Sequence, residues 1–170
     1  DERRRKKSSK KTITPPKWDK KTLHNDTLGL DLVVNLKNSE EGVVSFNKRG
    51  NKMFFTRAIF EKNKYQGRRI YSATFRGKKF RDVTMEVIPI DTLVDVHGPS
   101  VSPDEKSLFF SAEIPGGFGG TDIYVSHYDR RSKSWGEPEN LGPNINSAGN
   151  EGFPVFSGLT KNLYFSSDGR

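Results

Sequence analysis

The chain has 170 residues, of which 11% are aromatic and none is cysteine, and its formal net charge is +8. This length is sufficient for one domain with a substantial core, and the lack of cysteine excludes a disulfide framework, thiolate chemistry and cysteine-based metal sites. The sequence contains no apolar run of about eighteen residues, so no membrane-spanning helix is predicted. No signal peptide is visible in the sequence.

Residues 1–27 are predicted to form a basic, flexible tail. Residues 1–21 hold ten basic and three acidic side chains and so carry +7 of the net charge of +8, which leaves the rest of the chain nearly neutral. Such a run is usually a solvated linker, although it could also contact an acidic partner, an anionic lipid surface or nucleic acid. Residues 1–17 contain no aromatic side chain for base stacking, so we expect no nucleic-acid binding. The candidate interaction residues in the tail are Arg3, Arg4, Arg5, Lys6, Lys7, Lys10 and Lys11.

A repeat of 55 residues organises the remainder of the chain. The run Met-Phe-Phe-Thr at 53–56 recurs as Leu-Phe-Phe-Ser at 108–111 and as Leu-Tyr-Phe-Ser at 163–166, each time 55 residues further on. Apolar positions do not recur at helical spacing over any long stretch. A period near fifty made only of strands and turns predicts β-propeller blades rather than a helical solenoid.

The predicted fold class is therefore all-β, a partial propeller with about 55 residues per blade. Within residues 28–170 we expect a leading strand at 28–36, a blade at 42–91, a second at 96–146 and a half blade at 151–170. In the first blade we expect strands at 43–46, 52–57, 69–74 and 82–88, with a charged loop at 58–68. Such an arc exposes two apolar faces, so we expect further blades or a larger assembly to cover them.

The most regular motifs lie in residues 98–170. Residues 102–104 form a Ser-Pro-Asp turn. The proline fixes its own φ at a value that suits the turn, and the serine and aspartate side chains can form hydrogen bonds to the local backbone. A glycine-rich loop at 116–120 separates two strands. We expect structural roles for the repeat-motif residues Ser102, Pro103, Asp104, Gly116, Gly117, Gly119, Gly120, Asp122, Trp135 and Glu151.

No catalytic residue, metal site or cofactor is predicted. The glycine loop lacks the Gly-Lys-Ser/Thr ending of a phosphate loop and opens no helix. His24, His97 and His127 are too scattered for a metal site, and no Gly-x-Ser-x-Gly elbow is present. Calcium held by the carboxylates of Asp104, Asp122 and Glu151 is the sharper alternative to their expected role in turns.

These motifs resemble the WD40-like β-propeller repeat with the Pro-Asp turn, a family of Bacteroidetes envelope proteins. The resemblance covers about residues 41–170 and is weaker in 41–95, which lacks the Pro-Asp turn and the glycine loop. It implies a periplasmic, outer-membrane-associated scaffold of the kind found in the type IX secretion system. Members often carry a tetratricopeptide domain and an OmpA-like peptidoglycan-binding domain, so the implied partners are envelope proteins and, through such a domain, peptidoglycan. Membrane association would be indirect.

One alternative function and one possible modification remain open at this point. The chain could belong to a propeller-type enzyme that processes glycans or peptides with active groups in further blades. Thr27 and Thr92 lie in Asp-Thr-Leu sequences similar to the O-glycosylation acceptor of Bacteroidetes, although both sequences also suit plain turns.

Overall fold

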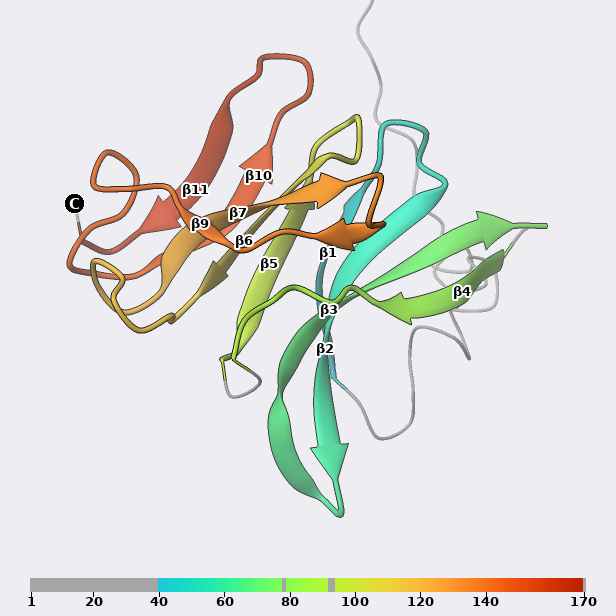
Figure 1. The fold of residues 1–170 in the computed structure, drawn as a ribbon, viewed down its shortest axis with the longest axis horizontal. Coiled ribbons are helices and arrows are strands. Elements are labelled where there is room, and N and C mark those ends of the chain that lie inside the picture. The colour runs from blue at the N-terminus through green and yellow to red at the C-terminus, as the bar shows by residue number, and fades with distance from the viewer. Residues whose placement is uncertain (1–39, 78, 92–93, 170) are drawn as a thin grey trace, which may run out of the picture.

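A computed structural model describes residues 40–77, 79–91 and 94–169. The basic tail, the expected strand at 28–36 and both threonines of the possible acceptor sequences lie outside the described residues. The described chain contains strands and turns but no helix, so the all-β prediction is confirmed (Figure 1). It therefore contains no helix that could span a membrane.

The first sheet is a four-stranded antiparallel meander in the order β1-β2-β3-β4. Its strands are β1 (Glu41–Phe46), β2 (Lys52–Glu61), β3 (Lys64–Arg76) and β4 (Lys79–Met85).

The second sheet has five strands, because its outermost strand is divided in two. Both short segments pair with β7, which leaves the path β5-β6-β7 with β8 and β9 on the outer edge. Its strands are β5 (Val96–Val101), β6 (Ser107–Ala112), β7 (Asp122–Asp129), β8 (Ser134–Trp135) and β9 (Glu139–Asn140). The third sheet consists of β10 (Glu151–Phe156) and β11 (Leu163–Ser167).

The first hairpin of each sheet has the same register, shifted by 55 residues each time. Each hairpin also has a register irregularity at the same place in its first strand. One set of equivalent pairs is Glu41↔Arg57, Val96↔Ala112 and Glu151↔Ser167, and another is Phe46↔Met53, Val101↔Leu108 and Phe156↔Leu163. The sheets are therefore three copies of one blade unit, and together they form an arc of a β-propeller.

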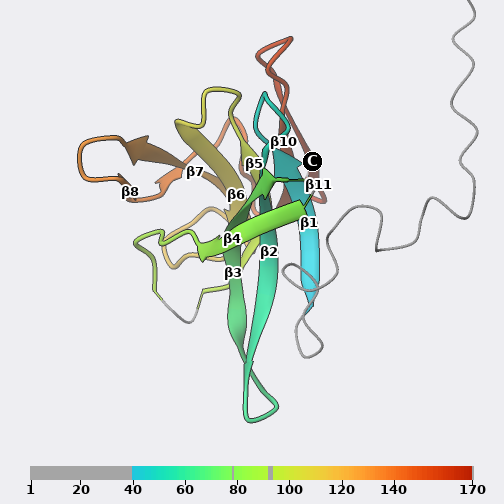
Figure 2. The ribbon, with the colours of Figure 1, turned by 90° about the vertical axis from the view of Figure 1, so that its right-hand side faces the viewer.

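The first strands of the three sheets are bonded to one another by a repeated contact. The amide of Val101 donates to Ser45 Oγ (3.2 Å), and one repeat later the amide of Phe156 donates to Ser100 Oγ (2.8 Å). These inner strands, β1, β5 and β10, lie near one another in Figure 2. The contact joins each blade to the next at equivalent positions of their first strands.

The main core lies between the first and second sheets. One face of the first sheet packs there against the inner face of the second. The opposite face of the first sheet carries a separate small cluster of Met53, Phe55, Ala73 and Phe80. The buried members of the main core are Phe54, Ile70, Val94, Val96, Val101, Leu108, Phe110, Ala112, Tyr124 and Trp135.

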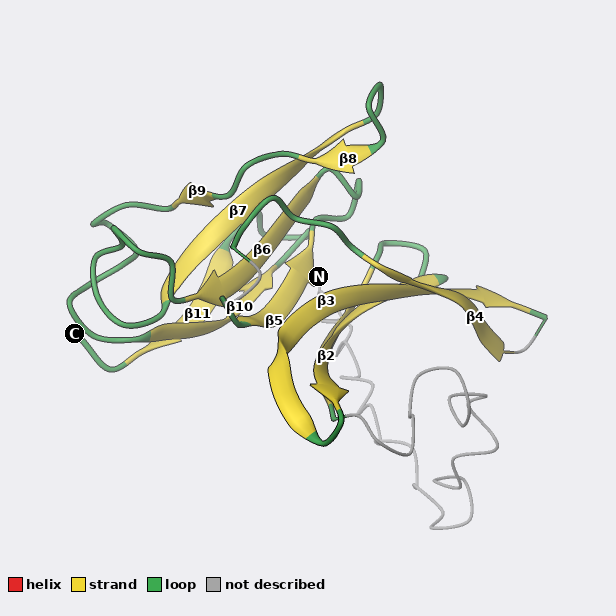
Figure 3. Cartoon of the chain, turned by 60° about the horizontal axis from the view of Figure 1, so that its bottom comes forward, coloured by secondary structure: helices red, strands yellow, loops and turns green. Residues whose placement is uncertain are grey.

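The prediction of a charged loop at 58–68 is wrong. β2 and β3 continue through this segment as a long hairpin that projects from the sheet (Figure 3). Its two-residue turn places Lys62 and Asn63 at φ 48° and 63°, as a type I′ turn requires. Phe60 and Tyr65 face each other across the strands with ring centroids 5.7 Å apart. This aromatic pair stabilises the hairpin across its two strands. The many charged residues of segment 58–68 had suggested a loop instead.

The fourth strand of the first blade also differs from the expectation of 82–88. It begins at Lys79 and ends at Met85. Phe80 is buried and its ring lies 5.2 Å from that of Phe75, so packing favours an earlier start. Asp82 adopts φ 54° where the register shifts, which allows the strand to continue past this point.

Candidate functional site

The Ser-Pro-Asp residues close the turn between β5 and β6. Ser102 Oγ donates to Asp104 Oδ1 (2.7 Å) and accepts the amide of Ser107 (2.9 Å). The bond from Ser102 is the main reason that the pKa of Asp104 is lowered. Pro103 lies against the third sheet, since a Cβ at Gly158 would meet its Cγ at 2.3 Å.

The glycine loop is held against neighbouring backbone and carboxylate groups. A Cβ at Gly119 would meet the carbonyl oxygen of Gly149 at 2.3 Å, and one at Gly117 would meet Asp122 Oδ2 at 2.3 Å. Asp122 is buried, and its Oδ2 accepts the amide of Phe118 (2.6 Å) and Asn140 Nδ2 (2.8 Å). Its Oδ1 has no hydrogen-bond partner within the described chain.

The remaining two glycines of the motif set differ in their surroundings. A Cβ at Gly120 would meet Asn150 Oδ1 at 2.2 Å, so this position too is closely packed. Gly116 adopts φ 90° with open space around it, so its requirement for glycine is conformational.

Trp135 and Glu151 take part in separate contacts. Trp135 Nε1 donates to Glu86 Oε2 (2.8 Å), which joins the second sheet to the segment that follows β4. Glu151 is buried and accepts the amide (2.9 Å) and hydroxyl (2.6 Å) of Ser147. Within residues 40–77, 79–91 and 94–169 no group of three His, Asp or Glu side chains could hold a metal ion.

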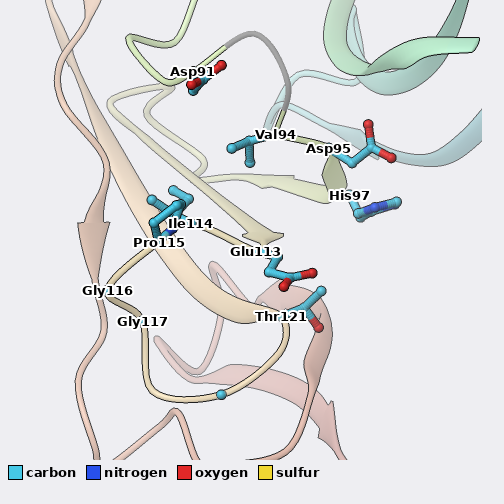
Figure 4. A pocket seen from close by; sticks show the side chains of 11 residues that line it. Asp91, Val94, Asp95, His97, Glu113, Ile114, Pro115, Gly116, Gly117 and Thr121 are labelled. Carbon is cyan, nitrogen blue, oxygen red and sulfur yellow. The ribbon is translucent and has the colours of Figure 1, made fainter.

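Two adjoining cavities lie near the start of the inner strands and share the side chains of His97 and Thr121. The first, of about 660 Å³, is shown in Figure 4 and is also lined by Asp91, Asp95, Glu113 and the glycine loop. We call it the acidic cavity. The second, of about 420 Å³, we call the arginine cavity, and its other lining residues are Gly42, Val43, Thr56, Arg68, Gly98, Ser111, Gly152 and Phe153.

Asp95 is held firmly at the border of the acidic cavity. Its Oδ1 accepts the amide of Arg68 (2.8 Å) and its Oδ2 accepts the hydroxyl of Tyr65 (2.5 Å). Burial, together with the bond to Asp95 and the charge of that carboxylate, raises the pKa of Tyr65 to about 12. The long hairpin is thus tied to the segment that precedes β5.

Arg68 and His97 form the polar wall of the arginine cavity. Arg68 Nη1 lies 3.3 Å from His97 Nδ1, so a neutral imidazole accepts the bond. Burial, and then the positive charge of Arg68, lower the pKa of His97, while Asp95 acts in the opposite direction. Arg68 Nη2 is 3.7 Å from the exposed carboxylate of Glu40, and Arg68 Nε is buried without a partner in the described chain.

The residues of this wall depart from the repeat. His97 occupies the position of Gly42 in the first blade and Gly152 in the third, and Arg68 corresponds to Thr121 in the second. From the sequence, His97 is considered only as a metal ligand and rejected, and Arg68, Asp95 and Glu113 are not singled out. The one available signal was a histidine between two glycines at the 55-residue spacing.

No family model matches the chain, and no curated protein matches it. Among solved structures the chain is similar to TolB from Acinetobacter baumannii, at 17% identity and a TM-score of 0.46, over 76% of this chain and 27% of that one. It is also similar to a luciferin-regenerating enzyme, at 14% identity and a TM-score of 0.47, over 78% of this chain and 40% of that one. The chain spans less than half the length of either protein. Its assignment as an arc of β-propeller blades rests on the three equivalent sheets and their common register.

Proposed function

We propose that the chain is part of a non-enzymatic β-propeller scaffold that binds proteins in the periplasm, in association with the outer membrane. The resemblance of its repeat motifs to Bacteroidetes envelope proteins supports this location. It also supports the more specific proposal that the protein serves type IX secretion, as a component similar to PorE. Peptidoglycan would be reached through a domain outside this sequence.

The observation that carries the proposal is that the polar residues of the repeat motifs are engaged in holding the fold together. The polar motif residues Asp104, Asp122 and Glu151 accept hydrogen bonds within the blades, and Ser45 and Ser100 join one blade to the next. The side chains of Arg68 and His97, in contrast, line a cavity by the inner strands. A framework of internally bonded blades that carries variable residues on its exposed surface is the usual plan of a repeat protein that binds partners.

The enzyme alternative requires a pair of carboxylates free to exchange protons with a substrate. The acidic cavity does bring Asp95 and Glu113 to one place. Both oxygens of Asp95, however, accept hydrogen bonds from the protein, so this side chain serves the fold. This geometry favours binding over catalysis.

A protein partner is favoured over nucleic acid. Outside residues 1–21 the chain has a net charge of only +1, which gives little attraction to a polyanion. The described surface instead offers cavities of mixed polarity and several exposed apolar side chains.

Cross-linking and affinity purification of the tagged full-length protein from its native bacterium would test the proposal. We expect recovery of envelope proteins with the wild type and with Phe110→Leu, which keeps the core apolar, and loss of them with Phe110→Asp, which disrupts it. Recovery of the same envelope proteins with the wild type and with both variants would show that their capture does not depend on the fold. Glycan or peptide hydrolysis by the purified protein that disappears in Glu113→Gln would overturn the non-enzymatic assignment.

A further inference from the structure

The two cavities beside His97 carry opposite charges. Three carboxylates and no lysine or arginine line the acidic cavity, whereas Arg68 and no carboxylate line the arginine cavity. Because both cavities share His97 and Thr121, one ligand could reach into both. Complementarity to this surface requires an anionic group next to a cationic one.

The arginine cavity is suited to a carboxylate. Arg68 has a buried Nε without a partner in the described chain, and its Nη2 has only a 3.7 Å contact with Glu40. Glu40 has 70% of its side chain exposed, so an incoming carboxylate could replace it at small cost. Arginine binds carboxylates through its planar donor set. The hydroxyl-bearing side chains of Thr56 and Ser111 and the ring of Phe153 complete a lining of polar and apolar groups.

The acidic cavity is suited to a basic side chain. Glu113 is exposed and forms no ion pair within the described chain, so its charge is available to a ligand. In Figure 4 the side chains of Asp95, His97, Glu113 and Thr121 lie toward one end of the cavity, and Asp91 lies apart from them. A lysine or arginine side chain entering here would meet carboxylates.

We propose that this surface binds the end of an extended peptide, with its terminal carboxylate at Arg68 and a basic side chain of one of its last residues in the acidic cavity. The inference rests on the proposed function as a protein scaffold and names the class of partner segment. Capture of a chain terminus by a small set of fixed donors is an established mode of peptide recognition. Both cavity volumes fall in the range of ordinary ligand sites.

Fluorescence anisotropy with the full-length protein would test the proposal. The probes are labelled pentapeptides of alanine with one lysine at either of the two positions before the last residue, each made with a free carboxylate and as the C-terminal amide. We expect the acid to bind about tenfold more tightly than the amide, as the loss of a charge-assisted bond predicts. Replacing the lysine by norleucine should weaken binding about fivefold, in line with a partly exposed ion pair.

Matched variants locate the two contacts. Arg68→Gln should abolish the preference for the acid, whereas Arg76→Gln, which removes the same charge from the far end of β3, should keep it. Glu113→Gln should abolish the preference for lysine, whereas Glu137→Gln on the exposed surface should not. Glu40→Gln should strengthen binding of the acid, because it removes the carboxylate that competes for Arg68.

Equal binding of acid and amide, or no binding of any probe, would overturn the inference while leaving the scaffold proposal intact. An acid preference that survives in Arg68→Gln would also overturn it, because the carboxylate would then bind elsewhere. Failure of the scaffold proposal is seen separately, as the absence of any envelope protein in the affinity purification.

Discussion

Phe110 lies in the middle of the main core with no exposed surface, and its ring stacks on Tyr124 at a centroid distance of 6.2 Å. We predict that Phe110→Ala lowers the free energy of unfolding by about 3–5 kcal/mol, because truncation of a large core side chain leaves a cavity. Urea unfolding of the full-length protein measures this change. Phe118→Ala is the control, since Phe118 is 48% exposed and its truncation should cost no more than about 0.5 kcal/mol. A Phe110→Ala protein as stable as the wild type that loses its partner would show a binding role instead.

The titration of His97 provides a second prediction. Burial and Arg68 lower its pKa in the folded protein, so the unfolded chain takes up the proton first as the pH falls. The contribution of His97 to stability is therefore complete above the unfolded pKa of about 6.5 and is lost as the pH falls from there to the folded pKa. Arg68→Gln should raise the pKa of His97, measured by NMR titration of the imidazole. An unchanged or lower pKa in this variant would contradict the close contact between the two side chains.

The inner strands depend on close approach at the irregularity in β5. Gly98 adopts φ 55°, and a Cβ there would meet Phe153 Cα and Pro154 Cδ, each at 3.3 Å. Gly50 adopts φ 65° in a turn with open space around it. We predict that Gly98→Ala destabilises the protein by at least about 1 kcal/mol more than Gly50→Ala does, because both incur the cost of positive φ but only the first adds a clash between blades. Thermal or urea unfolding of the two variants gives the comparison, and equal losses would refute the proposed tight contact.

The sequence was informative about elements where the repeat is regular. The aromatic runs at 53–56, 108–111 and 163–166 predicted the second strand of each blade, and these strands lie at equivalent registers. The long hairpin could not be predicted because its stabilising contact, between Phe60 and Tyr65, pairs residues on two strands that the charged composition concealed.

The candidate site was even harder to predict from the sequence than the long hairpin. Arg68 and His97 are 29 positions apart and meet only because β3 and β5 belong to neighbouring blades. Hydrophobic pattern and turn chemistry specify a strand and its exposed face, but they do not specify which side chains of two blades converge. A departure from the repeat, such as the histidine at 97, indicates where to look without giving the partner.

Over the whole molecule, the third sheet differs from the other two in how much of it is covered. Within the described residues, β11 pairs only with β10, whereas β6 pairs with both β5 and β7. Val155, Tyr164 and Leu159 are 56%, 54% and 94% exposed in this hairpin. At the other end of the arc, Val43, Val44 and Phe46 are 43–48% exposed on β1. An open strand edge can form hydrogen bonds to a further strand, and an exposed apolar face is usually covered by a packing partner.

We therefore predict that, in the full-length protein, further strands of the same chain or of an envelope partner cover β11. Hydrogen exchange followed by mass spectrometry or NMR tests this at the level of single strands, because β6 provides the equivalent covered strand in the same molecule. In the full-length protein, the β11 amides that point away from β10 should exchange as slowly as those of β6. In residues 40–170 expressed alone, the same β11 amides should exchange much faster, and the product should bind hydrophobic dyes or aggregate. The amides of β10 that bond to β11 serve as the control, since their partners are present in both proteins. Fast exchange of β11 in the full-length protein, or a monomeric and cooperatively unfolding 40–170 fragment, would show that the arc is complete as a unit and needs no covering strand.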